Sequence, residues 1–259
     1  MIDWKQYTDY IFCLHYLNNN RLNEITKTLT DINIDVNDSS FFSFIYDIDH
    51  CIFKDQMQSM KEEAFNLFNE KAKYYKLPIN NPKFDYVFYI ALNIYKTLKI
   101  AQYFKYDRII IFEDDIKFLK DTNYIINAMN FVKEQDFDIC ICQTTFVCAF
   151  HGIKSYLLEN DCEDLGNDMF LRTKEPLGLF GAGFTIFTNK GINKLLNYIE
   201  STNLLVAVDT YDGIRDIVDL DTLFALKPLC IQKCIITEWD DERRKEENIN
   251  MNIEEYNNE

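Results

Sequence analysis

Strand-like and helix-like runs of apolar residues alternate along most of the chain. Short runs rich in β-branched and aromatic residues predict strands at 10–17, 41–48, 108–112, 139–143, 184–188 and 231–237. Apolar positions three or four residues apart predict helices at 21–30, 56–75, 84–104 and 190–199, and another that begins after Asp121 and ends at Glu134. This alternation predicts an α/β fold with a mainly parallel sheet that helices cover on both faces.

The composition favours one large domain over two small ones. The chain has 259 residues, 47% of them hydrophobic, which is enough for a sizeable core. Only 7 glycines and 4 prolines are present, and no stretch reads as a linker, so we expect a single domain over residues 1–239. After Trp239, the run Asp-Asp-Glu-Arg-Arg-Lys-Glu-Glu opens an acidic polar tail, 240–259, which is expected to be a mobile or loosely helical terminus.

The charge balance limits the class of partner. Lys and Arg number 27 against 42 Asp and Glu, which gives a net charge of −15. Such a field repels phosphate backbones and anionic lipids, so no nucleic-acid partner is expected, and an anionic ligand would need a metal ion or a local cation. No run of about 20 apolar residues occurs, which predicts no transmembrane segment and at most a peripheral membrane contact.

The cysteines and the N-terminus indicate the compartment. Eight cysteines occur in a chain too long to need disulfide bridges, and Cys140 and Cys142 share one face of a predicted strand. The N-terminal residues lack the basic region and apolar core of a signal peptide. We therefore expect reduced, mostly buried thiols in a cytoplasmic protein.

One predicted strand ends in three consecutive carboxylates. The strand Arg108-Ile-Ile-Ile-Phe112 runs directly into Glu113-Asp114-Asp115. Ligands of α/β sheets bind outside the carboxyl ends of the strands. In an extended segment Glu113 and Asp115 point the same way and Asp114 points into the fold. Glu113 and Asp115 can therefore face one Mg²⁺ or Mn²⁺ ion, and a solvated acidic turn is the alternative.

These residues also carry a resemblance to a known family. Residues 106–116, Tyr-Asp-Arg-Ile-Ile-Ile-Phe-Glu-Asp-Asp-Ile, follow a long helix and resemble the core of the family 25 glycosyltransferases, the lipopolysaccharide-type galactosyltransferases. Further segments resemble motifs of that family in the same order: 10–14 with Arg21, 137–142, 181–191, 208–209 and 227–232. The resemblance implies a GT-A-like fold in which the acidic motif holds a metal ion on the diphosphate of a nucleotide sugar.

The resemblance also implies roles for single residues. Asp114 and Arg21 would contact the donor, Arg21 at the diphosphate or the uracil, unless Arg21 is simply a solvated residue of the first helical turn. Gly181 and Gly183 permit a positive φ and a close approach of the backbone to a sugar, although a tight loop entering the sheet needs the same glycines. In an inverting transfer Asp209 would take the proton of the acceptor hydroxyl.

Other acidic residues compete for these roles. Asp209 can instead begin a helix as its N-cap. Three other carboxylates in the same segment could also act as the base: Asp212, Asp219 and Asp221. A third metal ligand, often a histidine in this fold, would have to come from the segment after the last predicted strand: Glu238, Asp240 or Asp241.

The sequence departs from the family at one motif. The helix before the acidic strand reads Tyr89-Ile-Ala-Leu-Asn-Ile-Tyr95 and lacks the family's Ser-His pair, and the three histidines stand at 15, 50 and 151. The predicted function is a metal-dependent, inverting transfer of galactose or glucose from a UDP-sugar to a glycan acceptor. The alternatives are a non-catalytic glycan-binding or scaffold protein of the same fold, and a glycoside hydrolase that uses two carboxylates.

Overall fold

The computed structural model describes residues 1–15, 19–46, 82–118, 121–143, 162–166, 169–173, 183–202, 219–226 and 229–232. The helices are η1, a 3-10 turn (Trp4–Gln6), α1 (Asn19–Asp31), α3 (Pro82–Phe104), α4 (Thr122–Lys133) and α6 (Asn189–Thr202). The strands are β1 (Tyr10–His15), β2 (Phe42–Tyr46), β3 (Arg108–Glu113), β4 (Ile116–Phe118), β5 (Ile139–Ile141), β6 (Cys162–Asp164), β7 (Phe170–Thr173), β8 (Phe184–Thr188), β9 (Thr222–Ala225) and β10 (Cys230–Gln232). The predicted helix at 56–75 and the tail at 240–259 lie outside the described residues.

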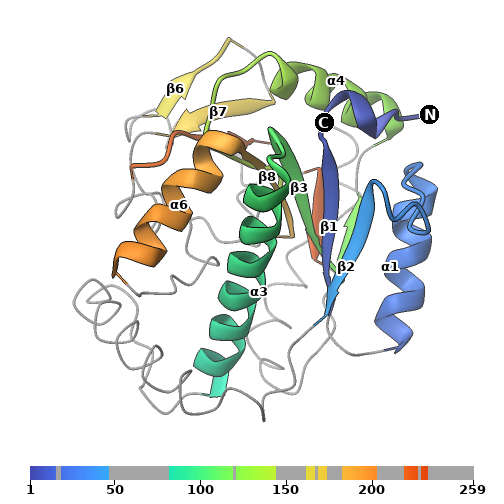
Figure 1. Cartoon of the computed structure of the whole chain (residues 1–259). Coiled ribbons are helices and arrows are strands. Elements are labelled where there is room, and N and C mark those ends of the chain that lie inside the picture. Colours follow the sequence, from blue (N-terminus) through green and yellow to red (C-terminus); the bar gives the residue numbers. More distant parts are fainter. Residues whose placement is uncertain are drawn as a thin grey trace.

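Within the described residues an eight-stranded sheet carries the fold, with the order β2-β1-β3-β8-β5-β9-β7-β6, and β10 pairs with β4 in a second sheet (Figure 1). Strands β2, β1, β3, β5, β9 and β6 run in one direction, whereas β8 and β7 run in the other. The predicted α/β class, with most strands of the sheet running in one direction, is confirmed in this architecture, and its GT-A-like character stays a prediction. Because β8 is antiparallel, its amino end lies at the same edge as the carboxyl ends of β3 and β5.

Helices cover both faces of the sheet, because alternate residues of each strand enter opposite cores. On one face Ile110 and Phe112 of β3 belong to the core that includes residues of α1 and α4. On the other face Ile109 and Ile111 pack with residues of α3 and α6. Figure 1 shows α3 and α6 next to each other across one face of the sheet. The short β-branched run of β3 is therefore buried on both sides, as its sequence predicts.

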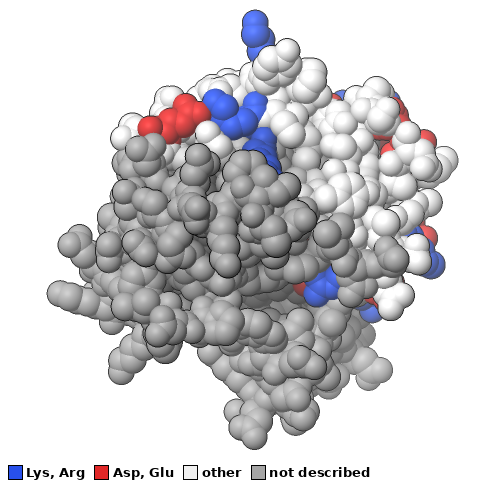
Figure 2. All heavy atoms as spheres, turned by 60° about the horizontal axis from the view of Figure 1, so that its bottom comes forward, with Lys and Arg blue, Asp and Glu red and all other residues white. Residues whose placement is uncertain are grey.

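The surface of the described residues carries scattered charge. On the face turned forward in Figure 2, described Lys and Arg side chains lie in separate places, and Asp and Glu side chains lie next to some of them. The net charge of −15 is thus not gathered into one broad acidic patch by the described residues visible there. No helix in the described part of the chain combines the length and the apolar character needed to span a bilayer.

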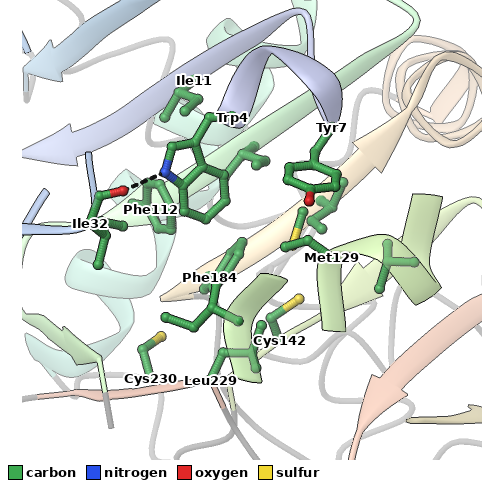
Figure 3. Packing of buried hydrophobic residues seen from close by; sticks show 14 of the residues in the cluster. Trp4, Tyr7, Ile11, Ile32, Phe112, Met129, Cys142, Phe184, Leu229 and Cys230 are labelled. Carbon is green, nitrogen blue, oxygen red and sulfur yellow. Dashed lines mark hydrogen bonds between the residues drawn. The ribbon is translucent and has the colours of Figure 1, made fainter. Parts of the chain in front are cut away.

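The N-terminal residues are anchored in the larger core (Figure 3). The indole Nε1 of Trp4 donates a hydrogen bond to the backbone oxygen of Ile32 at 2.8 Å. The same indole makes edge contacts with the rings of Phe112 and Phe184, each with ring centroids 6.3 Å apart. This buried Trp4, whose hydrogen-bonding end is satisfied, joins η1, the end of α1 and the centre of the sheet.

Four cysteines are free and buried in this core: Cys13, Cys140, Cys142 and Cys230. The Sγ atoms of Cys140 and Cys142 lie 3.7 Å apart on one face of the sheet. The prediction of buried, unbridged thiols is confirmed for these four residues.

Candidate functional site: a carboxylate cluster at the sheet edge

Three strands bring their ends together where the acidic run begins. Leu14 of β1 stands opposite Glu113 of β3 in the parallel register, so these two strands end at the same level. The backbone N–H of Glu113 donates to the carbonyl oxygen of Gly183, just before β8, at 3.0 Å. The run from Glu113 to Asp115 therefore lies at the carboxyl edge of the sheet, where ligands of α/β folds bind.

Asp114, the middle carboxylate, points into the fold and is only 4% exposed. Its Oδ2 lies 2.7 Å from Nδ1 of His15, and its Oδ1 accepts a hydrogen bond from Nη1 of Arg21 at 3.0 Å. An ionised carboxylate only accepts hydrogen bonds, so the imidazole hydrogen of this contact resides on Nδ1. The alternation of β3 gives this orientation, because Asp114 follows Ile110 and Phe112 on the face that α1 covers.

These contacts give Asp114 and Arg21 a structural role that needs no ligand. The Arg21 side chain is 13% exposed, so the pair is largely withdrawn from water. Arg21 is therefore not a solvated residue of the first helical turn, which was the alternative to a role in donor binding. The donor contacts expected of Asp114 and Arg21 stay predictions.

His15 is a buried residue of this site that the sequence reasoning missed. Its imidazole meets the rings of Phe44 and Tyr46 edge-on, with centroids 5.9 and 5.5 Å away. A signal was present in the sequence: Ile11, Cys13 and His15 alternate along β1, so a histidine ends the row of core-facing residues at the carboxyl edge.

The negative charge of the acidic run reaches the core beneath it. Burial raises the pKa of the Cys13 thiol well above its usual value, and the charges of the three acidic residues raise it further. Burial also raises the pKa of Cys230, with Glu113 and Asp115 adding to the effect. Both thiols therefore stay protonated and uncharged, so the negative charge in this region comes from the carboxylates.

Glu113 and Asp115 suit a divalent cation that is shared with a ligand. Mg²⁺ and Mn²⁺ are commonly held by one or two protein carboxylates, with water and substrate phosphates completing the coordination. Glu113 is buried, with 8% exposure, and Asp115 is half-buried, with its Oδ1 atom buried. The extended segment expected over Glu113–Asp115 ends at Glu113, because Asp114 and Asp115 form the turn between β3 and β4. No group of three or more potential His, Cys, Asp or Glu ligands occurs among the described residues. The metal role of Glu113 and Asp115 therefore stays a prediction, and the suggested third ligands lie outside the described residues: Glu238, Asp240 and Asp241.

Gly183 is required for a different reason from the one predicted. It does not adopt a positive φ, so the expected conformational freedom is not used there. Instead, a Cβ atom at this position would overlap Oε1 of Gln143 and would come within 2.7 Å of Cγ2 of Ile116. Gln143, which follows β5, is fully buried and was given no role by the sequence reasoning. Gly181 lies outside the described residues.

The candidate bases separate into two groups. Asp209 and Asp212 lie outside the described residues. Asp219 and Asp221 precede β9, which is parallel to β3 and β5, so they lie at the amino edge of the sheet. There the carbonyl oxygen of Asp221 accepts a hydrogen bond from the backbone N–H of Asp138 at 2.8 Å. The side-chain Oδ1 of Asp221 lies 3.3 Å from Nε of Arg172. The expectation that these two residues compete for the role of the base beside Glu113 is therefore wrong.

The chain is distantly similar to several solved structures. They include A197 from STIV (10% identity, 83% of this chain and 80% of that one, TM-score 0.39) and mouse xyloside xylosyltransferase 1 in its apo form (12%, 81% and 80%, 0.32). Another is the galactosyltransferase LgtC in complex with donor and acceptor sugar analogs (12%, 83% and 72%, 0.35). Similarity at this level carries no argument about activity. No family model and no curated protein matches the chain, so the resemblance to family 25 stays a prediction.

Proposed function

We propose that the chain is a metal-dependent glycosyltransferase that moves galactose or glucose from a UDP-sugar to a glycan acceptor with inversion. The observation that carries the proposal is the division of the acidic run at the end of β3. Asp114 turns inward to His15 and Arg21, whereas Glu113 ends β3 and Asp115 lies in the turn before β4, at the edge where ligands of α/β sheets bind. The resemblance of residues 106–116 to family 25 supports the same reading.

Glu113 and Asp115 would hold Mg²⁺ or Mn²⁺ through their carboxylate oxygens. When bound, the ion would supply positive charge to the diphosphate that leaves with the nucleoside. Asp114 positions this pair, because its two hydrogen bonds fix the backbone between the two ligand residues. A site fixed in this way needs little rearrangement when charge develops on the leaving group.

The acceptor hydroxyl needs a base in an inverting transfer. Its oxygen attacks the anomeric carbon, the bond to the diphosphate breaks, and the hydroxyl proton passes to a carboxylate. Asp209 is the proposed base, and this assignment rests on the resemblance of Val208-Asp209 to the family motif.

Calorimetric titration of UDP into the purified protein tests the proposal, first with Mn²⁺ and then with EDTA. We expect binding that requires the metal in the wild-type protein and is lost in Asp115→Asn. Asp121→Asn is the matched control, because it makes the same chemical change at the N-cap of α4, where asparagine caps as well as aspartate.

The outcomes separate the alternatives. Wild-type protein that binds no UDP in either condition would contradict the proposed donor, and unchanged binding by Asp115→Asn would remove the metal role. Donor binding without transfer to any glycan would favour the non-catalytic protein of the same fold.

A further inference from the structure

A buried amide beside the site has no partner among the described residues. The side chain of Gln143 is fully buried at the end of β5. Within the described part of the chain neither its Nε2 nor its Oε1 forms a hydrogen bond. Buried amides without partners are uncommon in folded proteins because their desolvation is not compensated. A partner from outside the chain would explain why a glutamine stands at this position.

Gly183 keeps the place of this amide open. Any side chain at position 183 would overlap Oε1 of Gln143, so the glycine and the glutamine form one packing unit. The carbonyl oxygen of Gly183 in turn accepts from the backbone N–H of Glu113 at 3.0 Å. The amide is thus held in a fixed relation to the carboxylates, through the strand that lies between β3 and β5.

The geometry of the sheet indicates which part of a ligand the amide meets. Strands β3 and β5 both flank β8, and neighbouring strands lie about 4.8 Å apart, so the ends of β3 and β5 are on the order of 10 Å apart. A nucleotide sugar held by its diphosphate at Glu113 and Asp115 would reach β5 with a group next to the phosphates. The hexose of the nucleotide sugar is such a group. Hexose hydroxyls both donate and accept hydrogen bonds, as the amide of Gln143 does.

We propose that Gln143 is a sugar-binding residue of this site, and that its amide hydrogen-bonds hydroxyls of the donor hexose. The inference rests on the proposed function, because it takes the diphosphate to lie at Glu113 and Asp115. Since the amide is fully buried, the hexose would reach it only after side chains at this edge of the sheet rearrange. Hydrogen bonds formed there are shielded from water, which strengthens them.

The variant Gln143→Met tests the proposal with two readouts. Methionine has a similar length and no hydrogen-bonding amide, so the melting temperature of the free protein should stay the same or rise. In Mn²⁺ the variant should bind UDP as the wild type does and should bind UDP-galactose or UDP-glucose about tenfold more weakly, which corresponds to ~1.4 kcal/mol. The exposed Gln6, changed to Met, is the matched control and should alter neither property.

Three results would overturn the proposal. A melting temperature lowered by several degrees would show that the protein itself satisfies the amide. Unchanged affinity for both UDP-sugars would indicate a buried water as the partner. An equal loss for UDP and the UDP-sugars would show that the amide does not contact the hexose. Gln143→Leu, measured in parallel, supplies the same readouts if the methionine variant does not fold.

The wild-type titration separates this inference from the function on which it rests. If the wild type binds neither UDP nor a UDP-sugar, the proposed function fails and the role of Gln143 fails with it. If it binds UDP in a metal-dependent way and Gln143→Met binds UDP-sugars equally well, only the role of Gln143 is overturned.

Discussion

The substitution Asp114→Asn should destabilise the protein even without a ligand. Asparagine keeps the shape of the side chain but removes its charge and one of its two acceptor oxygens. In the structure both oxygens are in use, with Oδ2 2.7 Å from Nδ1 of His15 and Oδ1 3.0 Å from Nη1 of Arg21. The variant can therefore satisfy only one of the two donors and leaves Arg21 without the opposite charge that it meets here.

The geometry sets the expected magnitude. Removing one partner of a buried ion pair typically costs about 3–5 kcal/mol, because the remaining charge is left in a poorly solvated place. The lower end applies here, since the Arg21 side chain keeps 13% of its exposure and asparagine retains one acceptor. A loss of about 3 kcal/mol in the free energy of unfolding corresponds to a decrease of roughly 6–12 °C in melting temperature for a domain of this size.

Urea unfolding and thermal melts measure this loss, with Asp115→Asn as the matched control. The control makes the same chemical change one residue later, on a half-buried carboxylate next to two like charges. We expect its free energy of unfolding to stay within about 1 kcal/mol of the wild type. The reasoning is refuted if Asp114→Asn is as stable as the wild type, or if both variants lose the same stability.

Two further predictions concern the core. In Gly191→Ala the new Cβ would overlap the backbone carbonyl of Asp138, so this helix substitution should cost about 1–3 kcal/mol in urea unfolding. A stabilised variant, the usual result of Gly→Ala within a helix, would contradict the packing. The raised pKa of Cys13 and Cys230 means that their contribution to stability is complete below the unfolded thiol pKa of about 8.5 and decreases as the pH rises above it. Urea unfolding at pH 7.5 and 9.5, with iodoacetamide labelling of the native protein, measures this effect, and rapid native labelling at pH 8.5 would contradict it.

Elements with strong local signals were predictable. The apolar run of β3 and the long helix α3 follow from composition and period, because burial on both faces or along one side selects such patterns. The cap of α4 is equally local: Oδ1 of Asp121 accepts from the backbone N–H of Tyr124 at 2.9 Å, as the cap rule predicts.

Other strands depend on partners that are distant in sequence. β6 is the polar tripeptide Cys-Glu-Asp, and it forms a strand because β7 offers a partner in which Arg172 stands opposite Glu163. The direction of β8 has no local signal either, since alternation looks the same in a parallel and an antiparallel strand. Asp219 and Asp221 were misplaced because β9 was not recognised, which left the edge of the sheet on which they lie undetermined.

In the candidate site, too, some features follow from local sequence and others depend on residues distant in sequence. The inward orientation of Asp114 followed from alternation alone. The importance of His15 and Gln143 arises from single contacts between segments far apart in sequence, with Asp114 in one case and Gly183 in the other. Period and composition do not report such contacts.

The electrostatics of the acidic run give the proposed metal dependence a physical basis. Three consecutive carboxylates would repel one another, and the chain offsets the middle one with Arg21 at 3.0 Å. The formal charges of Glu113 and Asp115 together equal in size that of one divalent cation. A diphosphate brought to this edge would face those two negative charges, while the guanidinium of Arg21 is engaged with Asp114. Binding of a nucleoside diphosphate at this edge should therefore fail without a divalent ion.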